Sequence, residues 1–344
     1  MNIIELVREN IKNIQPYSSA RDEFTEVNSN MVFLDANENP FNNGVNRYPD
    51  PQQNKVKQLL SAIKEVSTEN ILLGNGSDEV LDLVFRAFCE PTKDNVIILP
   101  PTYGMYAVLA NINAIDTIEV QLTIDFQAKT QAILSTANQN SKILFLCSPN
   151  NPTGNNFDKN SVELLLKSFN GIVVIDEAYI DFSEQETWLN RLEEFPNLVI
   201  TQTMSKAYGM AGIRLGICYA SKEIIQVLNS IKSPYNVNEL TQQKAIERLS
   251  NLKEITTEIQ QLNSQKKLLI KELKSIDFIE KVYASDANFV LVKVDNANKR
   301  YNQLIEKGIV VRNRTTQILC KNCLRFSIGT GEENKKLITV LKGI

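Results

Sequence analysis

Lys206 has the setting of a reactive amine. It follows the apolar run 198–200, with the hydroxyl residues Thr203 and Ser205 close by and Arg214 a few residues further on. A lysine that is desolvated near other cations has a lowered pKa, which leaves it partly unprotonated and able to form a Schiff base. The guanidinium of Arg214 suits a phosphate group. Taken alone, the same residues also fit a solvated lysine in a turn of small residues.

Asp176 ends a second apolar run, 171–175. Such a run indicates a strand buried on both faces of a parallel sheet. Asp176 then lies at the carboxyl end of the strand, where open α/β sheets bind their ligands. A carboxylate buried there needs a cationic or protonated partner, and a pyridinium nitrogen is one candidate, with Tyr179 donating to the phenolic oxygen of the same ring. A helix cap or a metal ligand is the alternative for Asp176.

Asn151 follows a third apolar run, 143–146, which begins after Lys142, and lies between Pro149 and Pro152. The prolines restrict the backbone on both sides, so the Asn151 amide can be held rigidly against a ligand oxygen. As an isolated motif this segment indicates only a turn. Its position after a buried strand, upstream of the other two strand ends, favours a binding site.

In this order, the three segments resemble the fold type I pyridoxal-phosphate enzymes, and among them the aminotransferases. Within that group the likeness is greatest to the histidinol-phosphate aminotransferases. The resemblance also extends over residues 37–40, 47–51, 74–79, 101–103 and 323–329. It implies pyridoxal 5′-phosphate as cofactor, a homodimer, and catalytic roles for Lys206, Asp176 and Tyr179.

Further cofactor contacts follow from the same resemblance. Residues 77–89 have apolar positions at helical spacing, with Ser77 as the expected N-cap and Asp78 in the first turn. The first amides of such a helix can hold a phosphate, although an ordinary capped surface helix has the same pattern. The resemblance places Tyr103 over the cofactor ring. The implied cofactor-binding residues are Gly76, Ser77, Asp78, Tyr103, Asn151, Asp176, Tyr179, Thr203, Ser205, Lys206, Arg214 and, across a dimer interface, Tyr48.

The resemblance assigns Arg325, Arg312, Tyr17 and Asn151 to the substrates, L-glutamate and histidinol phosphate. Arg325 matches the arginine that holds a substrate carboxylate, and a guanidinium fork suits carboxylate and phosphate equally. Arg312 matches a second basic residue for the substrate phosphate, but a solvated strand end is an equal alternative for it and for Arg314, which has no assigned role.

The implied reaction is transamination between L-glutamate or 2-oxoglutarate and histidinol phosphate or imidazole acetol phosphate, a step of histidine biosynthesis. Aromatic and aspartate aminotransferases and threonine-phosphate decarboxylases have similar sites and remain alternatives. A function of another class, a non-catalytic regulator on this fold, would be expected to carry a DNA-binding module. No helix-turn-helix segment or basic excess indicates one.

Composition excludes several classes of function. The 344 residues include no histidine, which excludes histidine-dependent hydrolysis and histidine-ligated zinc. The net charge of −3 does not indicate the basic surface that nucleic-acid binding requires. No apolar run approaches the ~20 residues that span a membrane, and the first residues do not resemble a signal peptide, so we expect a cytoplasmic protein. Five cysteines suggest reduced thiols, and the pair Cys320 and Cys323 lacks further ligands, so no metal is expected.

The order of elements predicts an α/β fold. Helices at 104–112 and 159–168 alternate with apolar strands at 96–99, 143–147, 172–175, 198–201 and 216–220. This alternation indicates a mostly parallel sheet sandwiched by helices, in a large cofactor domain over residues 31–250. A helix over 239–275 should lead into a smaller α+β domain, 251–344, with strands at 288–294 and 324–328. Residues 1–30 are expected to be an arm on the small domain or on a partner, and 18–30 and 121–140 to be loops.

Overall fold

A seven-stranded sheet forms the centre of the first domain. The computed structural model describes residues 2–17 and 31–344. In space the strand order is β1-β7-β6-β5-β4-β2-β3, and β7 is antiparallel to both neighbours while the other pairs are parallel. The strands are β1 (Ile71–Asn75), β2 (Asn95–Ile98), β3 (Asp116–Glu119), β4 (Ser141–Cys147), β5 (Ile172–Asp176), β6 (Leu198–Thr203) and β7 (Leu215–Ala220). The expected mostly parallel sheet is confirmed.

The central strands are buried on both faces, as their continuous apolar sequences require. In β5, Val173 and Ile175 join the core on one face, whereas Ile172 and Val174 join the core on the other. Asp176 continues the second of these alternating sets. The sheet thus directs Asp176 to one face and its neighbour Glu177 to the opposite face.

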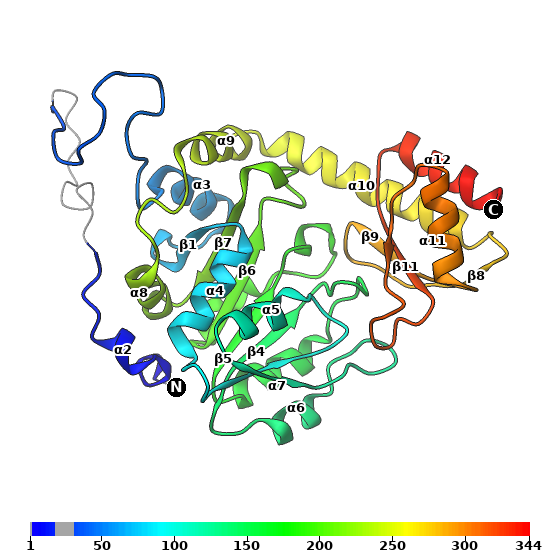
Figure 1. Ribbon diagram of the computed structural model, residues 1–344, viewed down its shortest axis with the longest axis horizontal. Helices are drawn as coiled ribbons and strands as arrows, with labels where there is room; N and C mark the ends of the chain where they lie inside the picture. Colours follow the sequence, from blue (N-terminus) through cyan, green and yellow to red (C-terminus); the bar gives the residue numbers. More distant parts are fainter. Residues whose placement is uncertain (1, 18–30) are drawn as a thin grey trace.

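Helices cover both faces of this sheet (Figure 1). Buried side chains of α4 (Ser77–Phe88), α5 (Met105–Ile112) and α8 (Lys222–Ile231) share a core with Val174. The opposite face is covered by α3 (Asn54–Lys64), α6 (Thr130–Thr136), α7 (Lys159–Ser168) and α9 (Glu239–Leu249). The prediction of a loop over 121–140 was wrong in part, because Ile133 of α6 is fully buried in that core.

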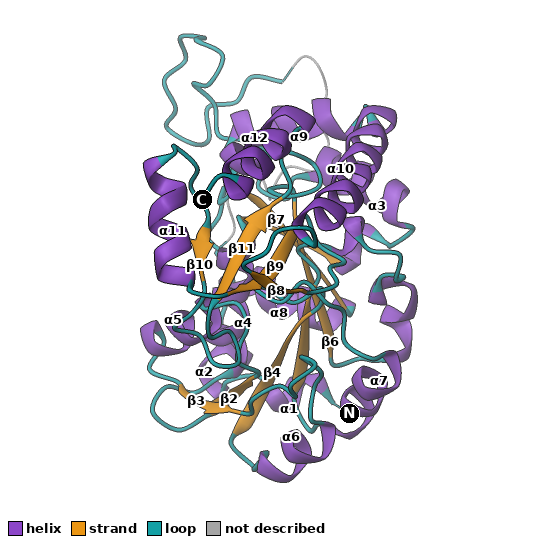
Figure 2. Cartoon of the chain, turned by 90° about the vertical axis from the view of Figure 1, so that its right-hand side faces the viewer, coloured by secondary structure: helices purple, strands orange, loops and turns teal. Residues whose placement is uncertain are grey.

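A second, antiparallel sheet has its own hydrophobic core (Figure 1 and Figure 2). Its strand order is β10-β11-β9-β8, and three helices accompany it. These elements are α10 (Leu252–Leu273), β8 (Ile279–Val282), β9 (Phe289–Val294), α11 (Ala297–Glu306), β10 (Arg312–Asn313), β11 (Cys323–Ser327) and α12 (Gly331–Lys342). Among the described residues no helix is long and apolar enough to cross a membrane.

The stretch 239–275 is two helices rather than the single helix expected. Helix α9 ends at Leu249 and α10 begins at Leu252, because Asn251 takes non-helical dihedral angles and bonds its side chain to Glu254 at 2.7 Å. Asparagine favours such capping positions over helix interiors.

The described part of the N-terminal arm lies on the first domain and not on the small domain, whereas the other expected position, on a partner, stays a prediction. Helices α1 (Ile3–Leu6) and α2 (Glu9–Lys12) lie against α8. Ile3 and Val7 are buried in the core that α4 and α8 share, and the Arg8 amide donates to the Ala87 carbonyl. The predicted loop 18–30 lies outside the described residues.

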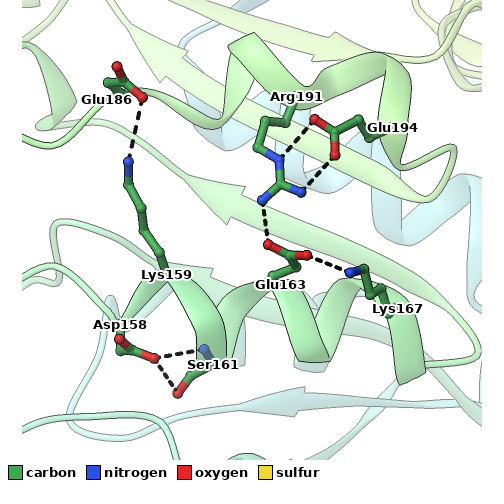
Figure 3. A network of polar contacts seen from close by, with 8 residues as sticks. All are labelled: Asp158, Lys159, Ser161, Glu163, Lys167, Glu186, Arg191 and Glu194. Atoms are coloured by element: carbon green, nitrogen blue, oxygen red, sulfur yellow. Dashed lines mark hydrogen bonds and ion pairs between the residues drawn. The ribbon is translucent and has the colours of Figure 1, made fainter.

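An ion-pair network on the other face ties α7 to the 3₁₀ segment Trp188–Glu194 that precedes β6 (Figure 3). The Arg191 guanidinium lies between Glu163 of α7 and Glu194, at 2.6 Å from each. Together with Lys167, Arg191 holds the pKa of Glu163 at about 2. The network is solvent-exposed and therefore contributes little stability.

Candidate active site

The carboxyl ends of β4, β5 and β6 and the start of α4 enclose one pocket. Its lining includes every residue of the expected cofactor set except Gly76 and Tyr48. The lining residues are Ser77, Asp78, Tyr103, Cys147, Asn151, Asp176, Ala178, Tyr179, Thr203, Ser205, Lys206 and Arg214. The parallel strands bring these residues together because their carboxyl ends share one edge of the sheet.

Asp176 is a buried acceptor held by three donors. The Tyr106 hydroxyl donates to Oδ2 at 2.7 Å, while the Thr201 hydroxyl and the Ala178 amide donate to Oδ1 at 3.1 and 3.2 Å. Burial raises the pKa of Asp176, and these donors oppose the rise. Asp176 caps no helix, since Tyr179 caps the next one, and no group of three potential metal ligands occurs in the described part of the chain.

Sequence reasoning missed both Tyr106 and Thr201. Tyr106 lies on α5, fully buried, stacked on Phe145 at 4.7 Å between ring centroids and perpendicular to Tyr103. Thr201 lies directly opposite Asp176 in the register of β5 and β6. Two signals pointed to these residues: the polar Thr201 in an apolar run, and the spacing of three residues between Tyr103, just before α5, and Tyr106 in its first turn.

Lys206 lies in the loop after β6. Its amine is 5.7 Å from the centre of the Tyr179 ring. Burial and the charges of Arg325 and Arg214 lower the pKa of Lys206, whereas Asp176 opposes them. The direction is the one expected from the sequence, and it increases the unprotonated fraction near neutral pH.

The start of α4 and Arg214 form an anion cradle. Gly76 is the N-cap, at a φ of 81° that glycine favours, and Ser77 is the first helical residue rather than the cap that the sequence suggested. A Cβ on Gly76 would lie 2.7 Å from Nη2 of Arg214. The guanidinium therefore lies directly against the backbone at the helix start, where amides and the helix dipole favour an anion.

Tyr103 and Asn151 both line the pocket wall. The Tyr103 hydroxyl donates to Asp78 at 3.1 Å. The Asn151 amide donates to the Tyr179 hydroxyl at 3.4 Å, and its oxygen accepts a hydrogen bond from Arg325 of β11. Arg325 thus joins the second domain to the pocket.

Arg312 lies opposite Arg325 in the register of β10 and β11, so both side chains leave the same face of the sheet. Two other predicted residues do not reach the pocket of their own chain. Tyr17 is 73% exposed, and Tyr48 stacks on Tyr235 with ring centroids 4.4 Å apart.

Comparison with known proteins decides the family. The profile of the family described as aminotransferase class I and II matches residues 29–341. The chain belongs to these aminotransferases. Histidinol-phosphate aminotransferases from Flavobacterium johnsoniae and Flavobacterium psychrophilum are 65% and 62% identical to it, over 99% and 100% of this chain and 98% and 99% of theirs. The crystal structure of the histidinol-phosphate aminotransferase from Clostridium acetobutylicum is 26% identical, with a TM-score of 0.80 over 87% of this chain and 90% of that chain.

Aminotransferases of this family use pyridoxal phosphate. The pocket fits that group. It offers an amine of lowered pKa, a buried carboxylate for a protonated ring nitrogen, and a cradle at Gly76 and Arg214 that a side chain would fill but a phosphate can occupy.

The charge of Asp176 is expected to be essential to this aminotransferase. Asp176→Asn keeps the size of the side chain but removes the charge that favours a protonated ring nitrogen, so turnover should fall by at least about 100-fold, or about 3 kcal/mol. The cofactor should still bind, because the anion cradle is intact. Measurement of kcat together with cofactor absorbance checks this.

The adjacent Glu177→Gln is the matched control, since Glu177 is equally buried but lies on the other sheet face with Thr187 and Gln202 as partners. It should destabilise the fold while keeping turnover within about fivefold. Similar turnover losses in both variants would contradict a special role for Asp176.

Proposed function

We propose that this aminotransferase exchanges an amino group between L-glutamate and imidazole acetol phosphate, giving 2-oxoglutarate and L-histidinol phosphate in histidine biosynthesis. The proposal rests chiefly on the arginines beside Lys206. The names of relatives that match nearly the whole chain point the same way.

Three arginines, Arg312, Arg314 and Arg325, gather at the β10–β11 edge, and no ion pair links them to a carboxylate of the described residues. Arg314 and Arg325 each keep a buried Nε that has no hydrogen-bond partner among the described residues. Burial, followed by the charges of Arg314 and Arg312, lowers the pKa of Arg325 to about 10, with Tyr179 opposing. A buried cation that lacks a partner is unfavourable. An anionic substrate would therefore be bound where it relieves this repulsion.

The positive charge of these arginines favours two anionic substrates that bind one after the other. Glutamate offers a carboxylate, for which the fork of Arg325 is suited, and histidinol phosphate offers a dianionic phosphate that can engage both Arg325 and Arg312. Aromatic and aspartate aminotransferases need no phosphate site. Threonine-phosphate decarboxylation shares the phosphate, so a side-by-side assay of the four substrate classes separates the alternatives.

The chain's own residues have separate tasks in the proposed reaction. The cofactor, when bound, supplies an electron sink for the negative charge that develops at the substrate Cα. The Lys206 amine would remove the proton from that carbon and return it. Asp176 would hold a proton on the ring nitrogen, and Arg214 and the α4 amides would bind the phosphate. Tyr103 would exclude water from one face of the ring.

We also propose that the protein is a cytoplasmic homodimer. In each subunit the boundary between the large and the small domain would lie at about the junction of α9 and α10. Residues 31–49 extend away from the body of the subunit, in the blue loop at the upper left of Figure 1. Val32, Leu34 and Phe41 on this segment are each at least 80% exposed. Neighbouring exposed apolar side chains favour a protein partner, and a second subunit would bring Tyr48, and Tyr17 with it, to the site of its neighbour.

Lys206→Ala should lower transamination by more than about 1,000-fold, because Lys206 is the one lysine among the described residues that line the pocket. Borohydride reduction of the wild-type holoenzyme and peptide mapping should place the pyridoxyl label on Lys206. Lys222→Ala, which removes an exposed lysine paired with Glu69, is the control and should keep full activity. A label on another lysine would refute the assignment.

Arg312→Ala should weaken the phosphorylated substrate selectively. Arg312 is exposed, and loss of a hydrogen bond between charged groups costs about 1.5–3 kcal/mol, so kcat/KM for histidinol phosphate should fall about tenfold or more, and that for glutamate less than about threefold. Arg325→Ala should lower both values. Half-reaction kinetics with each substrate measure this, and equal losses in Arg312→Ala would argue for a general amino-acid aminotransferase.

Mixed dimers test the shared site. Tyr48→Ala and Lys206→Ala should each be impaired as homodimers. A dimer with one subunit of each kind should regain one native site, because the subunit with Lys206 receives Tyr48 from its partner. Activity of the separately tagged, co-purified hybrid measures the effect. A hybrid no more active than the two homodimers would show that Tyr48 serves its own subunit or none.

A further inference from the structure

Lys64 lies outside the pocket but touches two segments that carry pocket residues. It is the last residue of α3, on the sheet face opposite Asp176. One of the two segments is 177–182, which follows Asp176 and includes Tyr179. The other is the loop 204–209, which carries Lys206.

The contact to the first segment is an ion pair. Lys64 Nζ lies 3.1 Å from Asp181 Oδ1, and the two side chains are only 14% and 19% exposed. Asp181 is in the 3₁₀ turn Ile180–Phe182, directly after Tyr179. The pair therefore fixes the end of the segment that begins at Asp176.

The contact to the second segment is through Tyr208, two residues after Lys206. The Tyr208 side chain is buried, the Lys64 amine lies 6.0 Å from its ring centroid, and the Lys64 charge acts on the Tyr208 hydroxyl. The Tyr208 carbonyl also accepts a hydrogen bond from Arg248 Nε at 2.9 Å. Tyr208 is thus anchored on both its backbone and its side chain, and Lys64 supplies the side-chain anchor.

The Lys64 ammonium remains charged in this setting. Burial opposes the charge, but Asp181, Tyr208 and Tyr219 together hold the pKa of Lys64 above its ordinary value. A charged group enclosed by protein is held at a well-defined position by its partners, since displacement would leave it and Asp181 uncompensated.

We propose that Lys64 is a positioning residue that joins segment 177–182 to the loop 204–209 and so sets the place of the Lys206 amine relative to Asp176 and Arg325. The inference rests on the proposed roles of Lys206 and Asp176. Small displacements of reacting groups lower rates strongly, so this link is expected to act on the chemical step although Lys64 touches neither substrate nor cofactor.

The Lys206 amine itself reports its position. In the cofactor-free protein, competitive acylation between about pH 7 and pH 11, followed by peptide mass spectrometry, gives the pH midpoint of Lys206 reactivity. Lys64→Met should raise this midpoint by about half a pH unit, which means about threefold lower reactivity at neutral pH. The reason is that a released loop lets the amine move away from Arg325 and become hydrated.

Control variants separate position from charge and stability. Lys222→Met removes the same charge from an exposed pair with Glu69 and should leave the midpoint unchanged. Lys64→Arg keeps the cation, so the pH midpoint of Lys206 should stay close to the wild-type value. Tyr208→Phe keeps the Lys64–Asp181 pair and releases only the loop, so it should shift the midpoint in the same direction and serves if Lys64→Met does not fold. An unchanged midpoint in folded Lys64→Met or Tyr208→Phe overturns the proposal.

Holoenzyme kinetics give an independent readout. In Lys64→Met, kcat should fall about tenfold while KM for glutamate stays within about twofold, because Arg325 is untouched. A change in KM alone also overturns the proposal. Borohydride mapping of the same samples distinguishes failure of the proposed function from failure of the role of Lys64. A label away from Lys206 refutes the proposed function, whereas a label on Lys206 with unchanged midpoint and kcat refutes only the role of Lys64.

Discussion

The buried charge of Asp176 is the constraint on which the pocket depends. A carboxylate enclosed between a sheet and a helix persists only if donors surround it. Tyr106, Thr201 and the Ala178 amide meet this need from α5, β6 and the turn after β5. Tyr106 reaches Asp176 because its ring is stacked on Phe145 of β4. Aromatic packing on this face of the sheet is therefore part of the electrostatics of the site.

Lys206 lies between charges of opposite sign that come from different parts of the chain. Asp176, on the first sheet, favours the protonated amine, whereas Arg325, on the second sheet, and Arg214 disfavour it. The protonation of Lys206 consequently depends on how the two sheets meet. Asn151 accepts a hydrogen bond from Arg325 and so connects the two sides at the pocket wall.

Sequence periodicity and strand-end residues predicted most of the first domain and the pocket. The strand assignments 143–147, 172–175 and 198–201 were confirmed within two residues, because burial on both faces demands continuous apolar runs. The donors to Asp176 were not predicted, because the sequence does not distinguish Tyr106 from an aromatic residue that is buried only for packing. The contact of the N-terminal arm with the first domain was not predicted, because Ile3 and Val7 fit any apolar surface, and local sequence does not say which one.

The family resemblance contributed what local patterns could not. Lys206, Asp176 and Arg214 were each ambiguous alone, and only their order along the chain favoured one cofactor. The second domain was harder to predict. Asn251 interrupts a helical pattern that continues on both sides, so the division into α9 and α10 depends on a single capping residue.

The anion cradle at α4 is made largely from main chain. Neighbouring atoms leave no room for a side chain at two positions there, and both are glycines. A Cβ on Gly216 would lie 2.2 Å from the Ser77 amide nitrogen, just as one on Gly76 would meet Arg214. The arginines at the β10–β11 edge, in contrast, act through side chains, with Arg312 on the two-residue strand β10, Arg314 directly after it and Arg325 on β11. With the proposed roles of these residues, cofactor affinity and substrate choice would be encoded by separable parts of the molecule. A protein engineer can diversify positions 312–314 to seek new amino acceptors without redesigning the part that retains the cofactor.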